Sequence, residues 1–335
     1  MYPINLTPTS QPPRGELPAV IEAPPSDPDA ARWVESRGAT LDEALYTHGA
    51  LLLRGFDFAS IDSFDRFLQA SGCHRLAYQY RSTTRHLKGD RIYTASEYSP
   101  AATIMLHSEN AYQDDWPMKL FFYCKTPAAH GGQTPIASNI RVAASIPPEV
   151  LAKFARLGLL YVRNYPDATD PASPNVDLAW QTVFQTESRD SVEHYCREHA
   201  MQAQWHSGGT LRTRQSAKAL VSHPKSGKLL WFNQAHVMHT SNMEPEQERA
   251  LRQMFAEEAL PRNCYYGDGT PIERHTLDLI RSSYVQNRCV FDWNAGDVLV
   301  LDNMLVAHGR LPFRGDREVL LAMADSYRSG RSLLE

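Results

Sequence analysis

Gly296-Asp-Val-Leu-Val-Leu301 leads directly into Asp302-Asn-Met-Leu-Val-Ala-His308-Gly-Arg310, and this stretch carries the strongest structural signal in the chain. A glycine turn followed by a short apolar run predicts a buried strand. Val319-Leu-Leu-Ala-Met323 predicts another strand, with Pro312 and Gly315 in the connection. The C-terminal region is therefore predicted to form two strands, with His308 just after the first.

The rest of the chain mixes helices with short strands. Thr40-Leu-Asp-Glu43 has the pattern of a capping box at the start of a helix that Gly49 ends. Ser60 begins another helix that runs to about residue 70, and Pro147-Pro148 opens one that runs to about residue 157. Three more helices are expected at 188–199, 244–258 and 271–284. Strands are expected at 50–56, 104–106, 120–124, 159–162 and 228–232.

Strands concentrated in the middle and at the end of the chain, with helices before and between them, predict an α+β fold. We expect a single domain over residues 29–335, built on a double-stranded β-helix (jelly roll) core with flanking helices. Residues 1–28 are rich in proline and lack periodicity, so we expect an extended arm on the surface or a partly disordered one.

Composition narrows the class of protein. The chain has 335 residues, of which 42% are hydrophobic and 21% charged, which suits a globular protein with a large core. The net charge is −4 and no run of Lys and Arg occurs, so neither nucleic acid nor a membrane surface is an expected partner. The five scattered cysteines, the lack of a signal peptide and the lack of a long apolar run favour a cytoplasmic location.

His107-Ser-Glu109 is the first candidate metal motif. Residues i and i+2 of an extended chain point to the same side, so one imidazole and one carboxylate project together. His308 supplies a second imidazole. Two histidines and one carboxylate on one face of an ion form the site of non-haem Fe(II) oxygenases and leave the other positions open. An isolated H-x-E pattern is common, so it carries little weight alone.

Arg317 and Thr134 strengthen this interpretation. Arg317 opens the strand that follows His308, and its guanidinium is suited to clamp the far carboxylate of a dicarboxylic cosubstrate. Thr134, in Gly131-Gly-Gln-Thr134, offers a hydroxyl beside a flexible turn for the same carboxylate. Four independent elements in the right order are far more specific than any one of them.

Other candidates are weaker. His236 and His239 have helical spacing but follow a strand, so a second metal pair is not favoured. Cys124 is expected in the core. The chain has no G-x-S-x-G, G-x-G-x-x-G or P-loop motif. Three further histidines in or after a polar helix are expected to be solvated: His194, His199 and His206.

The chain resembles the taurine dioxygenase/TfdA-like superfamily of Fe(II)/2-oxoglutarate enzymes. Its nearest likeness there is to clavaminate synthase-like members and to members like the aspartyl hydroxylase of syringomycin biosynthesis. The resemblance runs from about Gly49 to Asp325. It rests on His48-Gly-Ala-Leu-Leu-Leu-Arg-Gly-Phe56, His107-Ser-Glu109, Gly131-Gly-Gln-Thr134, Leu211-Arg-Thr-Arg-Gln215, Trp231-Phe-Asn-Gln234, and Asp302-Asn303 through His308-Gly-Arg310 to Arg317.

The resemblance implies that His107, Glu109 and His308 bind Fe(II), and that Thr134 and Arg317 bind 2-oxoglutarate. The spacing from His308 to Arg317 is shorter than in taurine dioxygenase, so Arg314 remains an alternative clamp. Glutamate as the carboxylate ligand fits the clavaminate synthase-like branch. It also argues against halogenation, because related halogenases have a small residue at that position.

The resemblance also implies the reaction. O2 and 2-oxoglutarate would be cosubstrates in hydroxylating an amino acid or amino-acid-like acid in a specialised-metabolite pathway, either free or tethered to a peptidyl carrier protein. Desaturation, cyclisation and oxidation of C–S, C–N or C–P compounds use the same ligands. A metal hydrolase or isomerase that does not use 2-oxoglutarate is a remote alternative, and a non-catalytic binding protein is a more remote one. Candidate substrate-binding residues are Asn110, Arg163, Arg212, Arg214 and Asn233. Asn110 and Tyr112, which follow the metal motif, are also candidates for a lid.

Overall fold

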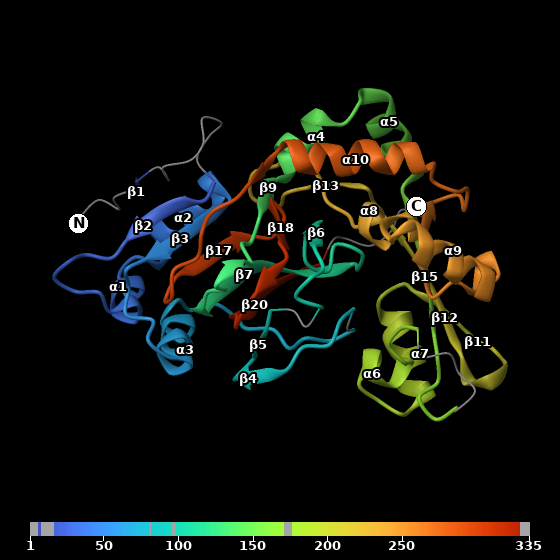
Figure 1. The fold of residues 1–335 in the computed structure, drawn as a ribbon, viewed down its shortest axis with the longest axis horizontal. Helices are drawn as coiled ribbons and strands as arrows, with labels where there is room; N and C mark the ends of the chain where they lie inside the picture. The colour runs from blue at the N-terminus through green and yellow to red at the C-terminus, as the bar shows by residue number, and fades with distance from the viewer. Residues whose placement is uncertain (1–5, 8–16, 81, 96–97, 171–175, 329–335) are drawn as a thin grey trace.

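A large sheet of eight strands forms the centre of the computed structural model, which describes residues 6–7, 17–80, 82–95, 98–170 and 176–328 (Figure 1). All neighbouring strands in this sheet are antiparallel except β2 and β3, which run parallel. In spatial order the strands are β1 (Leu6–Thr7), β2 (Ala19–Glu22), β3 (Ala50–Arg54), β17 (Val298–Asp302), β7 (Asp115–Thr126), β20 (Glu318–Arg328), β5 (Ile92–Thr94) and β4 (Leu87–Gly89).

A second sheet of four strands packs against one face of the first. Its spatial order is β16 (Arg288–Cys289), β9 (Ile136–Ser138), β18 (Val306–Arg310) and β6 (Ile104–His107). Leu120 and Phe122 of β7 share one apolar core with Ile136 of β9 and Val306 of β18. Two facing sheets built from strands distant in sequence are the arrangement expected of a jelly roll.

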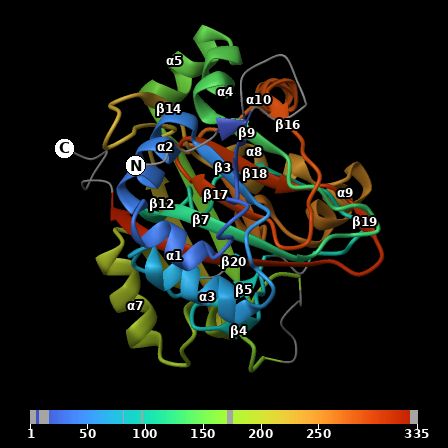
Figure 2. The same cartoon turned by 90° about the vertical axis from the view of Figure 1, so that its left-hand side faces the viewer.

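The opposite face of the large sheet is covered by helices. Because side chains alternate along a strand, Phe121 and Tyr123 of β7 point away from the second sheet. They pack in a separate core with apolar residues of the N-terminal helices, which lie in front of the sheet in Figure 2. These helices are α1 (Ala30–Glu35), α2 (Gly38–His48) and α3 (Ile61–Ala70).

The ends of these helices test the predicted caps. Ser60 caps α3 through a reciprocal capping box with Ser63, as a serine before an apolar pattern predicts. Gly49 ends α2 with a φ of 77°, also as predicted. The capping box predicted at Thr40 is wrong: α2 begins at Gly38, so Thr40 already lies inside the helix.

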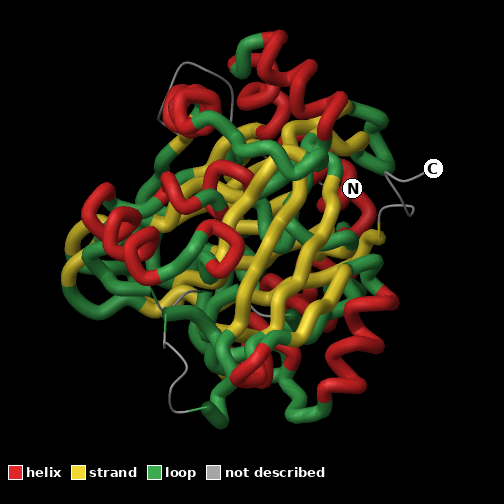
Figure 3. Tube along the Cα trace, turned by 90° about the vertical axis from the view of Figure 1, so that its right-hand side faces the viewer, coloured by secondary structure: helices red, strands yellow, loops and turns green. Residues whose placement is uncertain are grey.

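An inserted lobe carries a third sheet. Its strands are β11 (Gln202–Trp205), β12 (Leu211–Ala217), β10 (Leu159–Tyr165) and β15 (Arg262–Tyr266), in that order. Viewed from this side, helices surround the strands (Figure 3). The helices of this half are α4 (Asn139–Ser145), α5 (Pro148–Leu157), α6 (Trp180–Phe184), α7 (Arg189–Glu198), α8 (Ala235–Met238), α9 (Pro245–Met254) and α10 (Arg274–Gln286), with 3-10 turns at Ser207–Gly209, Thr240–Asn242 and Glu257–Ala259.

Two short two-stranded pairs complete the fold. They are β13 (Leu220–Ser222) with β14 (Leu229–Trp231), and β8 (His130–Gly131) with β19 (Phe313–Arg314). The predicted helices and strands are found with boundaries shifted by a few residues, and β7 and β20 are much longer than predicted. No helix within the described ranges is long and apolar enough to cross a membrane.

The proline-rich segment is only partly accounted for. Residues 1–5 and 8–16 lie outside the described residues. Ala19, Val20 and Ile21 are buried in strand β2, which pairs with β3. This part of the segment therefore belongs to the large sheet, because its apolar run fills a strand position beside Leu51–Leu53. The domain boundary at residue 28 stays a prediction.

Candidate metal centre and cosubstrate site

His107, Glu109 and His308 meet between the two sheets. The pairing of β6 with β18 places His107 directly opposite His308, with ring centroids 4.6 Å apart. Glu109 follows the end of β6, and its Oε2 lies 3.9 Å from His107 Nε2 and 3.7 Å from His308 Nε2. The sequence predicts His308 just after a strand, whereas in the structure it lies within β18. The three side chains offer three ligand atoms within 4.8 Å of one another.

This donor set fits one metal ion. Bonds from imidazole nitrogen or carboxylate oxygen to a first-row divalent metal are about 2.0–2.2 Å long. Two donors can therefore share an ion when they lie less than about 4.4 Å apart. The two distances from Glu109 Oε2 meet this condition, so small side-chain movements suffice to bind the ion.

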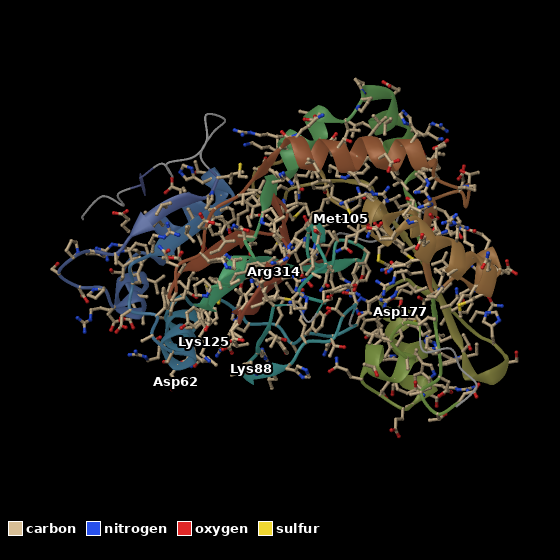
Figure 4. The ribbon with its side chains drawn as sticks, in the orientation of Figure 1. Asp62, Lys88, Met105, Lys125, Asp177 and Arg314 are labelled. Atoms are coloured by element: carbon tan, nitrogen blue, oxygen red, sulfur yellow. The ribbon has the colours of Figure 1, made fainter. Side chains whose placement is uncertain are left out.

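Both imidazoles are prepared for metal binding. His107 Nδ1 lies 2.8 Å from the carbonyl oxygen of Met105, which is labelled in Figure 4; donation to this carbonyl leaves the Nε2 lone pair free. Burial, followed by the charges of His107 and Arg85, holds the pKa of His308 well below its usual range. His308 is therefore neutral near neutral pH, and a neutral imidazole is the form that binds metals.

Asn303 fixes the main chain of Glu109. Its Oδ1 accepts from Glu109 N at 2.7 Å, and its Nδ2 donates to Glu109 O at 2.9 Å and to Pro117 O at 2.8 Å. Asn303 is fully buried. The sequence comparison with the superfamily had included Asn303 in a motif without giving it a role, and its structural role is to orient the carboxylate ligand.

Two residues at the start of α8, Gln234 and His236, hold the main chain of the metal motif. Gln234 Nε2 donates to Ser108 O at 2.7 Å, and His236 Nε2 lies 2.8 Å from Leu106 O. Burial lowers the pKa of His236 to about 3, so the neutral ring donates this hydrogen bond. His236 and His239 are in neither of the groups of three or more possible metal ligands found among the described residues.

Arg85 is an unpredicted member of the site. It lies in a loop before β4, and its Nη2 is 3.0 Å from both Oε1 and Oε2 of Glu109. Both side chains are buried, with relative exposures of 6% and 4%. Nothing in the sequence marks Arg85, because it lies far from the metal motif along the chain and belongs to no recognised pattern.

Thr134 and Arg317 lie at the same end of β18. Main-chain hydrogen bonds from Gly309 to Pro135 and from Leu311 to Gln133 place Thr134 beside this strand. Thr134 is buried, and its Oγ1 accepts from Trp293 Nε1 at 3.0 Å, so its own proton can be donated.

Arg317 is a partly buried cation that lacks an acidic partner among the described ion pairs. Its Nε donates to Gly132 O at 2.9 Å, two residues from Thr134. Burial, and then the charge of Arg310, lowers the pKa of Arg317 to about 10, although Cys124 opposes this shift. A guanidinium in this state favours an anionic ligand. Arg314 is exposed in β19, so the alternative clamp does not share this environment (Figure 4).

A second group of metal-binding residue types lies elsewhere. Asp114, Asp115 and His199 lie close together, but the guanidinium of Arg328 already bonds Asp114 at 2.9 Å and His199 Nδ1 at 3.2 Å. His199 is therefore not solvated as predicted, because it is held by Asp114 at 2.7 Å.

The other two histidines expected to be solvated differ from each other. His194 is exposed, as predicted, whereas His206 is half-buried. Cys124 is a core residue, as predicted, and burial raises the pKa of its thiol to about 12.

The candidate arginines for substrate binding point to different sides of the inserted sheet. Arg163 pairs with Thr213 across β10 and β12, so it shares a face with Thr213 and not with Arg212 or Arg214. Arg163 is buried, with its guanidinium 4.7 Å from the ring centroid of Tyr165. A single carboxylate therefore cannot contact all three arginines.

The remaining candidates have local roles. Asn233 donates to Ala219 O and accepts from Ala235 N, so both ends of its amide bond the main chain. Asn110 has a φ of 56°, which turns the chain just after the carboxylate ligand. Tyr112 is fully buried and does not lie on an exposed lid, because its hydroxyl donates to Tyr80 O at 3.2 Å.

Comparisons with known proteins identify the family. The family described as "Taurine catabolism dioxygenase TauD, TfdA family" matches residues 12–323. The dapdiamide synthesis protein DdaC of Enterobacter agglomerans is 41% identical over 285 residues, covering 85% of this chain and 84% of the relative. A clavaminate synthase-like protein of Arabidopsis thaliana is 30% identical over 322 residues, covering 92% and 93%.

Solved structures share the fold at low sequence identity. PvcB, an Fe, α-ketoglutarate-dependent oxygenase from an isonitrile synthetic pathway, superposes with a TM-score of 0.52 at 16% identity, covering 98% of both chains. Asparagine oxygenase in complex with Fe(II), 2S,3S-3-hydroxyasparagine and succinate gives a TM-score of 0.54 at 12% identity, covering 91% of this chain and 93% of that one. These likenesses confirm the predicted jelly roll. The chain therefore belongs to the TauD/TfdA family and is a 2-oxoglutarate-dependent dioxygenase.

Proposed function

We propose that His107, Glu109 and His308 hold the Fe(II) ion of this dioxygenase, and that Thr134 and Arg317 bind the far carboxylate of 2-oxoglutarate. The observation that carries the proposal is that the three candidate ligands meet where β6 pairs with β18. Arg317, a cation with no acidic partner among the described ion pairs, lies at one end of β18. Iron and 2-oxoglutarate together supply O2 activation, which oxidises a C–H bond of the substrate.

The protein side chains prepare this chemistry. Nε2 of His107 and of His308 would donate the lone pairs, and Asn303 and Arg85 orient Glu109. The Thr134 hydroxyl donates to the bound carboxylate while Arg317 neutralises its charge. Apolar neighbours such as Phe122, whose ring centroid is 4.9 Å from that of His308, keep water from this side of the site.

We further propose that the substrate is an amino acid or amino-acid-like acid and that the reaction is hydroxylation. Two similarities support this: DdaC is a dapdiamide synthesis protein, and asparagine oxygenase was solved with a hydroxylated amino acid. Glu109 supports oxygenation over halogenation because it fills the ligand position. Delivery on a peptidyl carrier protein is the alternative to a free substrate.

A cavity of about 770 Å³ is the proposed route for the substrate. Ser82, Thr83 and Thr84 line it and lead directly into Arg85, the partner of Glu109. On the other side it is lined by 166–170 and by residues near Asp177, which is labelled in Figure 4. The cavity therefore lies between the jelly roll and the inserted lobe and reaches the loop that contacts the metal ligands.

An anaerobic titration tests the metal and cosubstrate assignments. Apo-protein with Fe(II) and 2-oxoglutarate is expected to develop the weak visible charge-transfer band of the chelate. His308→Ala should abolish the band. Arg317→Ala should weaken 2-oxoglutarate without weakening Fe(II), and Arg314→Ala serves as the matched control because Arg314 is exposed. A wild-type protein without the band, or a band that persists in His308→Ala, would contradict the proposal.

Product analysis tests the substrate class. Mass spectrometry should show a gain of one oxygen atom in an amino acid from a panel of free amino acids, with succinate formed in equal amount. A panel of the same amino acids loaded on carrier protein tests the alternative. Activity on carrier-bound substrates alone would rule out a free amino acid, and loss of two hydrogens instead of oxygen gain would indicate desaturation.

A further inference from the structure

Arg85 presents an unusual arrangement for a metal site. Both nitrogens of its guanidinium fork are used: Nη2 contacts both oxygens of Glu109 at 3.0 Å, and Nη1 donates to Ala95 O at 2.6 Å. The guanidinium also lies 5.0 Å from the ring centroid of Tyr78. Arg85 itself is 8% exposed. A buried cation beside a site that binds a dication weakens metal binding, so its presence needs a reason.

The loop that carries Arg85 is held in place. His86 N donates to Thr94 Oγ1 at 2.9 Å, and Thr94 N donates to His86 O at 2.9 Å. These bonds tie the loop to strand β5 of the large sheet. The guanidinium is therefore held in place from the side of the large sheet, independently of Glu109. If orienting the carboxylate were its only role, a neutral hydrogen-bond donor would serve without adding positive charge.

The two oxygens of Glu109 are not equivalent. The shortest approach of each imidazole Nε2 to the carboxylate is to Oε2, at 3.9 Å from His107 and 3.7 Å from His308. Oε2 is therefore the atom that faces a metal held by both histidines. Arg85 Nη2 contacts both oxygens at 3.0 Å, so Oε2 is shared between Arg85 and the histidine side, whereas Oε1 faces Arg85. Glutamate can bind a metal through one oxygen or through both.

We propose that Arg85 is a positioning residue that restricts Glu109 to metal binding through Oε2 alone. This inference rests on the proposed function of the site. If Oε1 also bound the ion, it would occupy a position that the cosubstrates need, because the two-histidine, one-carboxylate site works through its open positions. Arg85 keeps that position open by holding Oε1 with charge and hydrogen bonding.

The experiment measures two quantities in each variant: the affinity for the metal, and whether the coordination position that O2 would use is open. Nitric oxide serves as the probe for the open position, because it binds Fe(II) where O2 would bind and gives an electron paramagnetic resonance signal. Arg85→Met should bind Mn(II) and Fe(II) as tightly as wild type or more tightly. In the presence of 2-oxoglutarate under anaerobic conditions, its nitric oxide signal should fall about tenfold. Arg85→Lys, which keeps the charge and one donor, should recover part of the signal.

The controls separate this inference from a loss of structure. Arg54→Met removes a comparable partly buried ion pair, with Asp297 at 2.6 Å, and should change neither metal binding nor the signal. Two outcomes would contradict the proposal that Arg85 keeps Glu109 bound through one oxygen. In the first, both Arg85 variants lose metal binding and the nitric oxide signal in proportion. In the second, both variants keep wild-type metal binding and the wild-type signal. Failure of wild-type protein to bind Fe(II) would instead contradict the proposed function.

Discussion

Replacing Arg317 by methionine should stabilise the apo-protein while weakening 2-oxoglutarate. Burial lowers the pKa of Arg317 from 12.5 to about 10, and a shift of this size corresponds to a destabilisation of about 3 kcal/mol below pH 10. The sign follows because the folded state disfavours the charged form, and this penalty disappears only as the pH rises from 10 to 12.5. Methionine removes the penalty but also removes the hydrogen bond to Gly132 O, worth about 1 kcal/mol. The net expected gain is about 2 kcal/mol.

The same substitution removes the charge that is proposed to bind the cosubstrate. Hydrogen bonds to charged groups contribute about 1.5–3 kcal/mol each, so the dissociation constant of 2-oxoglutarate should rise about 10- to 100-fold. Urea unfolding of apo-protein at pH 7.5 measures the first effect, and titration of the visible band measures the second. Arg314→Met, at an exposed position, should change neither. An Arg317→Met protein that is less stable than wild type and binds 2-oxoglutarate normally would refute the reasoning.

Three further predictions concern the support of the site. Asn303→Ala removes three buried hydrogen bonds, so the free energy of unfolding should fall by about 3 kcal/mol. Calorimetry should show metal affinity reduced about 10- to 100-fold. Normal metal affinity would contradict the role given to Asn303. Gly132→Ala places a Cβ 2.9 Å from Ala128 Cβ and 3.0 Å from Arg317 Cδ, at a φ of 72°. The substitution should therefore destabilise the protein by about 1–3 kcal/mol and weaken the binding of 2-oxoglutarate in the titration of the visible band. Unchanged binding would show that Arg317 tolerates displacement. Burial lowers the folded pKa of His236 from 6.5 to about 3. Because only the unfolded state binds the proton between pH 6.5 and 4.5, lowering the pH over this range should remove about 3 kcal/mol of stability. The free energy of unfolding of His236→Gln should depend less on pH, and an equal pH dependence would contradict this assignment.

The sequence predicts the ligands of the site better than their supports. His107 and Glu109 follow a recognisable strand pattern, and His308 and Arg317 follow another, so local periodicity and order along the chain suffice to find them. Arg85 cannot be found in this way, because it reaches Glu109 only through the folding of a loop onto β5. Residues that act through long-range hydrogen bonds carry no local pattern.

Two predictions of secondary structure differ from the structure. Thr40 has the sequence of a cap, but α2 begins two residues earlier, at Gly38, and Thr40 lies exposed in its first turn. Val20 and Ile21 lie among prolines, and the local composition suggests an arm. Their apolar side chains are buried because β3 offers a free edge for pairing. For β2, pairing with β3 decides what the local sequence leaves open.

Gly309 separates two residues of β18 with different contacts: His308 faces the candidate metal centre, and Arg310 bonds main-chain carbonyl oxygens. Residues i and i+2 of a regular strand face the same side, so His308 and Arg310 would both point at the metal. The pairing between β6 and β18 shifts here: His308 faces His107, whereas Arg310 faces Ile104, so β6 contributes one extra residue. Such a bulge re-aims side chains beside a site.

The bulge requires glycine, because a Cβ at position 309 would lie 2.5 Å from Ile104 O. Arg310, on the other side of Gly309, bonds three carbonyl oxygens of the 98–102 segment. His308 alone is left to face Glu109. A larger residue at position 309 would push β18 away from β6 and so disturb both the histidine and the arginine beside it.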